Sequence, residues 1–206
     1  SVVAYRCDNG AIAWVGGEGR LSYSSPQLVR FGQSELILMA TETGLQALEP
    51  GSGRSAWRHD WPTQSMRIVQ PQLLGYGQVL FASGYGTGTR LLRIGRRENG
   101  WDVAQAWSTK DLEPYFNDSV GHQGYVYGFD GKVLACIDLR TGKRCWKGGR
   151  YGYGQILLLP EMDLLLVLSE TGEAVLVRAD PRQHRELGRF QAVQGKTWNH
   201  PVIAHD

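Results

Sequence analysis

The chain has few cysteines, little net charge and no long apolar run, and each shortage excludes a class of protein. Three cysteines in 206 residues are too few for a disulfide framework. Lysine and arginine total 22 against 20 acidic residues, without a basic stripe, which argues against a nucleic-acid-binding domain. No apolar run approaches about 18 residues, so we expect no transmembrane helix, and the first residues contain no signal peptide.

Motifs that would mark common active sites are also missing. The sequence contains no Gly-x-Ser-x-Gly elbow, no Cys-x-x-Cys-His haem site and no His-x-x-x-His spacing. Gly84–Gly88 is glycine-rich like a phosphate loop, but no Lys-Ser or Lys-Thr pair follows it. We therefore interpret this segment as a wide hairpin turn, and the sequence predicts no metal site.

The chain is instead rich in glycine and aromatic residues, which recur with a regular period. It has 27 glycines, seven tryptophans and nine tyrosines, a composition that fits short strands joined by tight turns. A turn followed by a large apolar residue recurs in steps of about 40 to 50 residues, the period of a β-propeller blade. The landmarks are Trp14, Trp57, Trp107, Trp146 and, in a degenerate copy, Phe190.

The clearest repeat, Gly124–Trp146, shows how one blade is built. Asp130-Gly131 and Thr141-Gly142 are turn pairs, and the segments around them read as strands. A further short strand opens each repeat, which gives four strands per unit. The sequence predicts an all-β propeller of four-stranded antiparallel blades, with about five units in one domain or propeller fragment. Four units are complete, at 24–57, 70–107, 117–146 and 154–190, and the fifth is split between 1–14 and 197–206.

The two ends of the chain leave two architectures open. Residues 1–14 supply the last two strands of a blade and 201–204 supply a first strand, so the ends could pair and close a five-blade ring. Alternatively the chain is an arc of a larger propeller, whose unpaired strand edges need a partner. We favour the arc and a homodimer, because exchange of edge strands between copies costs little.

Two of the three cysteines fall on neighbouring strands. Counting outward from the Thr141-Gly142 turn places Cys136 opposite Cys145 and Ile137 opposite Arg144. Directly opposed residues have Cβ atoms about 4.5–5.5 Å apart, so a disulfide could form with a small adjustment. Two free buried thiols are the alternative. Cys7 lies in a turn and is expected to be a free surface thiol.

The segment Ala135–Trp146 resembles a known repeat, written Ala-x-Asp-x-x-Thr-Gly-x-x-x-Trp, with one extra residue between Ala and Asp. This is the tryptophan-docking motif of quinoprotein-type (PQQ-like) β-propellers, and Leu45–Trp57 and Val3–Trp14 resemble weaker copies. The resemblance covers essentially the whole chain. It implies that Trp14, Trp57, Trp107, Trp146 and Phe190 pack against the neighbouring blade.

The family resemblance also bounds the function. Its members include pyrroloquinoline-quinone alcohol dehydrogenases and the non-catalytic scaffold lipoprotein of the outer-membrane β-barrel assembly machinery. The dehydrogenases often place two adjacent cysteines over the quinone, and no two cysteines are adjacent here. Possible mimics of their Ca²⁺ ligands are Asn117, Asp118 and Asn199. We therefore expect a non-catalytic scaffold that binds a protein partner, in the bacterial periplasm or secreted, without a cofactor. PQQ with calcium applies only to the alternative, an enzyme.

A site would lie where the loops enter the innermost strands, at 22–25, 65–70, 115–119, 151–155 and 196–200. These loops are polar, and all but one contain an aromatic residue, as ligand pockets often do. The candidate catalytic residues are His200 as base, Asp118 as its carboxylate partner and Arg67 as an anion clamp, which would suit a hydrolase. The candidate ligand-binding residues are Tyr23, Ser25, Gln70, Asn117, Ser119, Tyr153, Gln155, Trp198 and Asn199.

Two alternatives apply to these side chains. The polar ones could simply satisfy main-chain groups at the entry to each blade, which we consider the stronger interpretation. Trp61, Trp101 and Trp198 lie outside the docking position and could instead bind carbohydrate.

Overall fold

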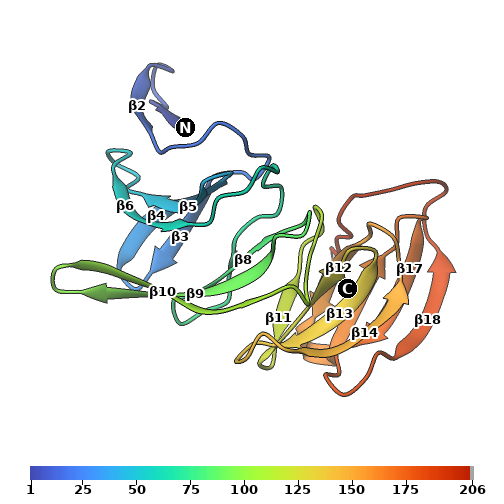
Figure 1. Ribbon diagram of the computed structural model, residues 1–206. Helices are drawn as coiled ribbons and strands as arrows, with labels where there is room; N and C mark the ends of the chain where they lie inside the picture. Colours follow the sequence, from blue (N-terminus) through green and yellow to red (C-terminus); the bar gives the residue numbers. More distant parts are fainter. Residues whose placement is uncertain (205–206) are drawn as a thin grey trace. The chain divides into compact units, whose positions relative to one another are not determined.

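The computed structural model describes residues 1–204 and consists almost entirely of antiparallel strands (Figure 1). The strands are β1 Val2–Tyr5, β2 Ile12–Gly16, β3 Gln27–Phe31, β4 Ser34–Thr41, β5 Gly44–Leu48, β6 Ser55–Asp60, β7 Gln72–Leu73, β8 Gln78–Ser83, β9 Gly88–Arg97, β10 Gly100–Thr109, β11 Val120–His122, β12 Tyr125–Asp130, β13 Val133–Asp138, β14 Arg144–Arg150, β15 Gln155–Leu159, β16 Leu164–Leu168, β17 Glu173–Arg178 and β18 Glu186–Gln191. One 3₁₀ turn, Pro160–Met162, joins β15 to β16. Within residues 1–204, no helix has the length and apolar character needed to cross a membrane.

Four sheets contain four strands each, and within each sheet the strands follow chain order. They are β3–β6, β7–β10, β11–β14 and β15–β18, while β1 and β2 form a two-stranded sheet. This meander is the arrangement of a propeller blade, so the expected all-β class with four-stranded antiparallel blades is confirmed.

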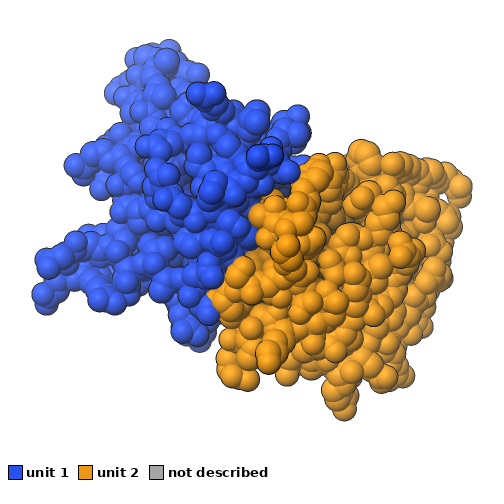
Figure 2. All heavy atoms as spheres, in the orientation of Figure 1, with its two compact units in different colours: residues 1–81, 90–106 blue, residues 82–89, 107–206 orange. Residues whose placement is uncertain are grey.

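The chain divides into two compact units (Figure 2). Unit 1 comprises residues 1–81 and 90–106, and unit 2 comprises residues 82–89 and the chain from 107 onward. The dividing line runs through the β7–β10 sheet, so this sheet contributes residues to both units.

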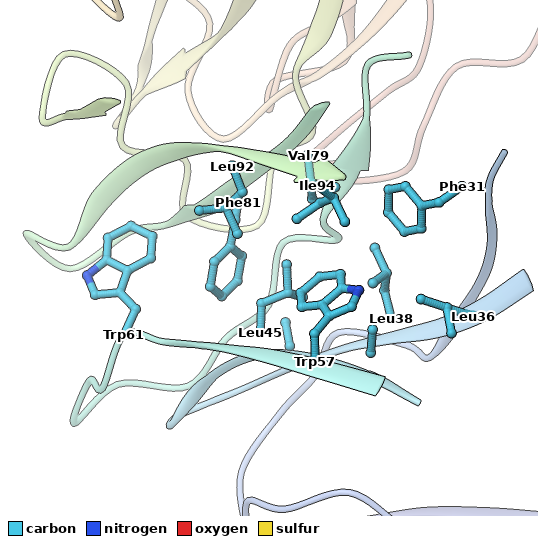
Figure 3. Close-up of a cluster of buried hydrophobic side chains, with 12 residues drawn as sticks. Phe31, Leu36, Leu38, Leu45, Trp57, Trp61, Val79, Phe81, Leu92 and Ile94 are labelled. Atoms are coloured by element: carbon cyan, nitrogen blue, oxygen red, sulfur yellow. The ribbon is translucent and has the colours of Figure 1, made fainter. Parts of the chain in front are cut away.

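The hydrophobic core of unit 1 lies between the faces of two successive sheets (Figure 3). Leu38 and Leu45 from the β3–β6 sheet pack with Phe81 and Leu92 from the β7–β10 sheet, and all four are almost fully buried. In unit 2, the β11–β14 and β15–β18 sheets bury a corresponding cluster that includes Phe129 and Val167. Middle strands are buried on both faces, as β5 illustrates with five buried residues out of five, because neighbours cover both sides.

Three tryptophans connect one sheet to a turn of the next through their indole N–H groups. Trp14 Nε1 donates to the Pro50 carbonyl at 2.9 Å, and Trp107 Nε1 donates to the Leu139 carbonyl at 2.7 Å. Trp146 Nε1 donates to the Asp180 carbonyl, also at 2.7 Å. A buried donor left without a partner would cost free energy, so each bond makes burial of the indole favourable.

Glycine in the receiving turn is required for two reasons. Gly53 and Gly142 adopt φ values of +69° and +71°, a region that other residues rarely occupy. A Cβ on Gly53 would also lie 2.4 Å from the Trp14 ring, and one on Gly142 would lie 2.7 Å from the Trp107 ring. The Thr-Gly and Ser-Gly turns of the sequence thus leave room for the incoming indole.

Trp57 and Phe190 differ from the other landmarks. Trp57 is 6% exposed and packs edge-on against Phe31, but its indole N–H has no hydrogen-bond partner. The next sheet offers the long β9–β10 hairpin in place of a Thr-Gly turn. Phe190, expected in a docking position, is 68% exposed.

Two details of the sequence-based expectations require correction. Residues 201–204 form no strand, so the split blade is represented by β1 and β2 alone among the described residues. A single extended segment needs a hydrogen-bonding neighbour to become a strand. Part of the expected fifth unit, residues 205–206, lies outside the described chain.

The second correction concerns the cysteines. A β-bulge between Cys136 and Ile137 shifts the register, so Cys136 lies opposite Trp146 while Ile137 still lies opposite Arg144. All three cysteines are free, with Cys136 buried and Cys7 and Cys145 exposed. Burial, with Cys145 alongside, raises the pKa of the Cys136 thiol. The expected Cys136–Cys145 disulfide assumed that the two residues lie directly opposite each other, and in the structure they do not.

The pairing of indole and carbonyl predicts unequal effects of one substitution at two sites. Trp107→Phe removes a ring portion and a buried hydrogen bond, whereas Trp57→Phe removes a similar ring portion and an unpaired N–H. We expect Trp107→Phe to lower the free energy of unfolding by about 1 kcal/mol more than Trp57→Phe does. Urea unfolding of both variants measures this difference. Equal losses would contradict the stabilising role of the bond.

Candidate functional site

Five aromatic rings form a continuous surface on unit 2, which we call the aromatic strip. Its members are Tyr85, Tyr115, Phe116, Tyr153 and Trp198. Ring centroids are 4.9 Å apart for Tyr85 and Tyr115, 5.1 Å for Tyr115 and Tyr153, and 5.3 Å for Phe116 and Trp198. Tyr85 lies in the β8–β9 turn, and the others lie in the loops that precede β11, precede β15 and follow β18. The fold thus gathers rings from four separate segments.

The strip is accessible to solvent at both ends. Tyr85 is 53% exposed and Trp198 is 49% exposed, while the other three rings are partly buried. A hydrogen bond between the hydroxyls of Tyr85 and Tyr115 raises the pKa of Tyr85 to about 12. Gly84 permits this contact, because a Cβ there would lie 2.8 Å from the Pro114 carbonyl oxygen.

Buried amides beneath the strip hold its loops together. Asn117 is fully buried, and its Nδ2 donates to the Gly154 carbonyl at 2.5 Å. Gln155 is 3% exposed; its Oε1 accepts from the Asp118 amide at 3.2 Å and its Nε2 donates to the Trp198 carbonyl at 3.3 Å. The side chains of these two predicted ligand-binding residues therefore form hydrogen bonds with main-chain groups. This is the arrangement of the alternative interpretation, in which polar side chains satisfy the main chain at the entry to each blade. Their effect is to fix the positions of Tyr153 and Trp198.

The predicted residues of unit 1 come together separately, around the loops at 22–25 and 65–70. The Tyr23 amide donates to the Arg67 carbonyl at 2.7 Å, and the Gln70 side-chain amide bonds with Ser24 and Ser25. Tyr23 is 70% exposed, whereas Gln70 is engaged with the neighbouring loop. This repeats the pattern of unit 2, where an amide side chain secures the adjacent loop.

Arg67 does not lie where an anion clamp would need to be. It is fully buried, its Nε donates to the Thr41 carbonyl at 3.3 Å, and its Nη2 donates to the Trp61 carbonyl. The guanidinium carbon also stacks over the rings of Trp61 and Phe81. Burial and the nearby Arg90 lower the pKa of Arg67 to about 10. The sequence-based role is corrected: this cation supports the interior of unit 1.

Two of the three tryptophans considered for carbohydrate binding are similarly engaged. Trp61 is 8% exposed and lies under the guanidinium groups of both Arg67 and Arg90. Trp101 packs against Phe31 with ring centroids 5.9 Å apart and is covered by Arg96. Trp198 is the member of this set that remains half exposed.

His200 and Asp118, chosen from separate loops of the sequence, are brought together. His200 Nε2 lies 3.2 Å from Asp118 Oδ2, with side-chain exposures of 47% and 34%. Burial raises the pKa of Asp118, and His200 partly opposes that shift. The pair can exchange a proton, but the adjacent Ser119 is only 4% exposed and offers no accessible nucleophile. Asn199 is exposed beside them.

Three charged residues beside the strip, Lys132, Glu170 and Lys196, were not predicted from the sequence to belong to a site. Lys132 Nζ lies 4.9 Å from the Tyr153 ring centroid, and Lys196 Nζ lies 4.4 Å from that of Trp198. Glu170 accepts hydrogen bonds from Trp198 Nε1 at 3.0 Å and from the Tyr153 amide at 3.3 Å. Lys132 and Glu170 lie on hairpin turns and Lys196 lies in the segment after β18, and composition and spacing do not predict that these three segments meet.

Two cavities lie along the strip. One, of about 440 Å³, is lined by Gly84, Tyr85, Gly86, Glu113, Tyr115, Asp130, Gly131, Lys147 and Tyr153. The other, of about 580 Å³, is lined by Lys132, Glu170, Thr171, Gly195 and Lys196. Within residues 1–204, no group of three or more His, Cys, Asp or Glu side chains could hold a metal ion.

A comparison with protein families decides the relationship. The family model described as outer membrane protein assembly factor BamB matches residues 1–148. The chain belongs to this family. No protein in the curated set matches it significantly. The PQQ-like propeller relationship expected from the sequence is therefore confirmed.

Solved structures agree on the fold of this BamB family member. BamB from Moraxella catarrhalis is 18% identical with a TM-score of 0.56, and the match covers 91% of this chain and 54% of that one. The computationally designed protein Ika8 is 11% identical with the same TM-score, and the match covers 95% of this chain and 70% of that one. The chain spans about half the length of the Moraxella BamB.

The His200–Asp118 pair predicts a specific titration. The pKa of Asp118 is raised above its ordinary value of 3.8 in the folded state. Its contribution to stability is therefore fully present below pH 3.8 and is lost as the pH rises through the folded-state pKa. Because protonated His200 lowers the pKa of Asp118, His200→Ala should raise it further. Carboxyl ¹³C NMR titration of both proteins measures the shift, and an unchanged or lower pKa in the variant would contradict it.

Proposed function

We propose that this chain is a non-catalytic scaffold module that binds a protein partner through the aromatic strip. The observation that carries the proposal is a run of aromatic side chains, exposed at its two ends, above loops whose buried amides already form hydrogen bonds with main-chain groups. Aromatic residues are enriched at protein interfaces and dominate their binding energy. Rigid loops also lower the ordering cost of binding.

The family supports the biological setting of this proposal. Its description names an outer-membrane protein assembly factor, which fits a bacterial protein that works in the periplasm beside other assembly proteins. The chain covers about half of the Moraxella protein, so this setting is an inference for the chain.

A PQQ–calcium site fits the described residues poorly. Asn117 donates its amide to the Gly154 carbonyl, and Asp118 pairs with His200, so two of the three possible calcium ligands are engaged elsewhere. We therefore propose no cofactor.

One observation favours a second candidate, hydrolysis at the His200–Asp118 pair. The 3.2 Å approach of imidazole and carboxylate would suit a general base. Such a centre would lose its turnover in both His200→Ala and Asp118→Asn, with the fold retained. The buried position of Ser119 makes the scaffold the stronger proposal.

Site-specific photo-crosslinking tests the scaffold proposal. With benzoylphenylalanine at position 85, we expect protein adducts in periplasmic extracts, because Tyr85 is 53% exposed at the end of the strip. The matched control carries the same group at Tyr5, which is 61% exposed on β1. Gel shifts and mass spectrometry measure the adducts. Absence of adducts at 85, or equal yields at both positions, would contradict the proposal.

Self-association belongs to the same proposal, because β18 is an edge strand with exposed apolar side chains. Leu187 is 40% and Phe190 is 68% exposed there, and unpaired edges favour pairing with another chain. We expect light scattering of the purified chain to give the mass of a homodimer, and Phe190→Lys to give that of a monomer. A monomeric parent chain would contradict it.

A further inference from the structure

We infer that the aromatic strip recognises a proline-rich segment of its partner that carries an acidic residue next to the prolines. This rests on the proposed function, since it names the chemistry of the partner that the strip would bind. Three properties of the strip carry it: its apolar rings, its free hydrogen-bond donors and an unpaired lysine.

The acceptors beside the strip are largely occupied. Glu170 already accepts from Trp198 Nε1, from the Tyr153 amide and, at 3.1 Å, from Lys196 Nζ. Asp130 Oδ2 accepts from Lys147 at 2.6 Å and from Arg144 at 2.8 Å. Of the three carboxylates that line the two cavities, only Glu113 forms no ion pair within residues 1–204, so a ligand rich in hydroxyl donors, such as a saccharide, would find one free carboxylate here.

The donors, in contrast, remain available. The Tyr153 hydroxyl forms no hydrogen bond within residues 1–204, and the bonded pair of Tyr85 and Tyr115 retains one hydroxyl proton for a ligand. A polyproline segment offers the matching chemistry, because its residues lack N–H groups and its carbonyls are fully exposed acceptors. Its preformed extended helix also binds at a low entropic cost on grooves lined by aromatic rings.

The shape of the strip suits an extended partner. Tyr85, Tyr115, Phe116 and Trp198 follow one another with centroid steps of 4.9, 5.2 and 5.3 Å. A polyproline helix rises about 3.1 Å per residue, so several consecutive residues would span the run. The 440 Å³ cavity between Tyr85 and Tyr153 provides a place for one proline ring.

Lys132 adds a charge preference. It lines the 580 Å³ cavity with Lys196 and Glu170, and of the two lysines only Lys196 forms an ion pair in the described chain. Lys132 lies over Tyr153, so its ammonium group borders the rings directly. An acidic residue beside the prolines would neutralise this cation.

Fluorescence anisotropy with labelled peptides tests the inference on the full chain. The probe is a blocked polyproline peptide ending in two glutamates; comparison peptides replace the glutamates with lysines or the prolines with glycine and serine. We expect saturable binding of the probe only, weakened about fivefold or more by Tyr85→Ala and by Tyr153→Ala. Tyr5→Ala, an exposed tyrosine on β1, is the matched control and should bind as the parent does.

Lys132→Met should weaken the binding of the glutamate peptide by about fivefold and make this binding insensitive to salt concentration. Circular dichroism of each variant establishes that the fold is retained. Absence of probe binding, equal binding of the glycine-serine peptide, or competition by maltohexaose would overturn the inference. Position-85 adducts with a protein partner, in the absence of any peptide binding, would overturn this inference and leave the scaffold proposal intact.

Discussion

The structure depends on the contact between an indole ring and a turn of the next sheet. Trp107 donates to the Leu139 carbonyl and occupies the space left by Gly142, and Trp14 does the same at Pro50 and Gly53. A four-stranded sheet has two apolar faces and cannot bury both by itself. The indole adds direction to this burial, because its N–H has to reach one particular carbonyl.

The need to pair buried donors and acceptors also explains the polar side chains of the interior. Asn117, Gln155 and Arg67 would be costly to bury alone, yet each forms hydrogen bonds with main-chain groups. In unit 2 these hydrogen bonds hold the loops that carry Tyr153 and Trp198, so they position the rings of the aromatic strip. Asn117, Gln155 and Arg67 were predicted from the sequence to contact a ligand. In the structure they are buried beneath the surface that a partner could reach.

How far the sequence could predict the site depended on the kind of residue. Tyr153, Trp198, His200 and Asp118 were found because they occupy loops that enter inner strands, and repeat spacing locates such loops. Tyr85 and Lys132 were missed, because they lie on hairpin turns that differ from blade to blade in length. Arg67 was placed wrongly, because loop position does not reveal whether a long side chain turns inward.

The sequence by itself determined the blade plan: turn pairs, apolar strands and a tryptophan at four of the five landmark positions. All of these act between residues near in the chain or in the next repeat. Tertiary structure alone decided the β-bulge that places Trp146 instead of Cys145 opposite Cys136, the unpartnered N–H of Trp57 and the irregular course of residues 201–204. It also decided which rings meet in the aromatic strip. These features depend on packing between segments far apart in the chain, and local patterns contain no information on which side chains compete for the same space.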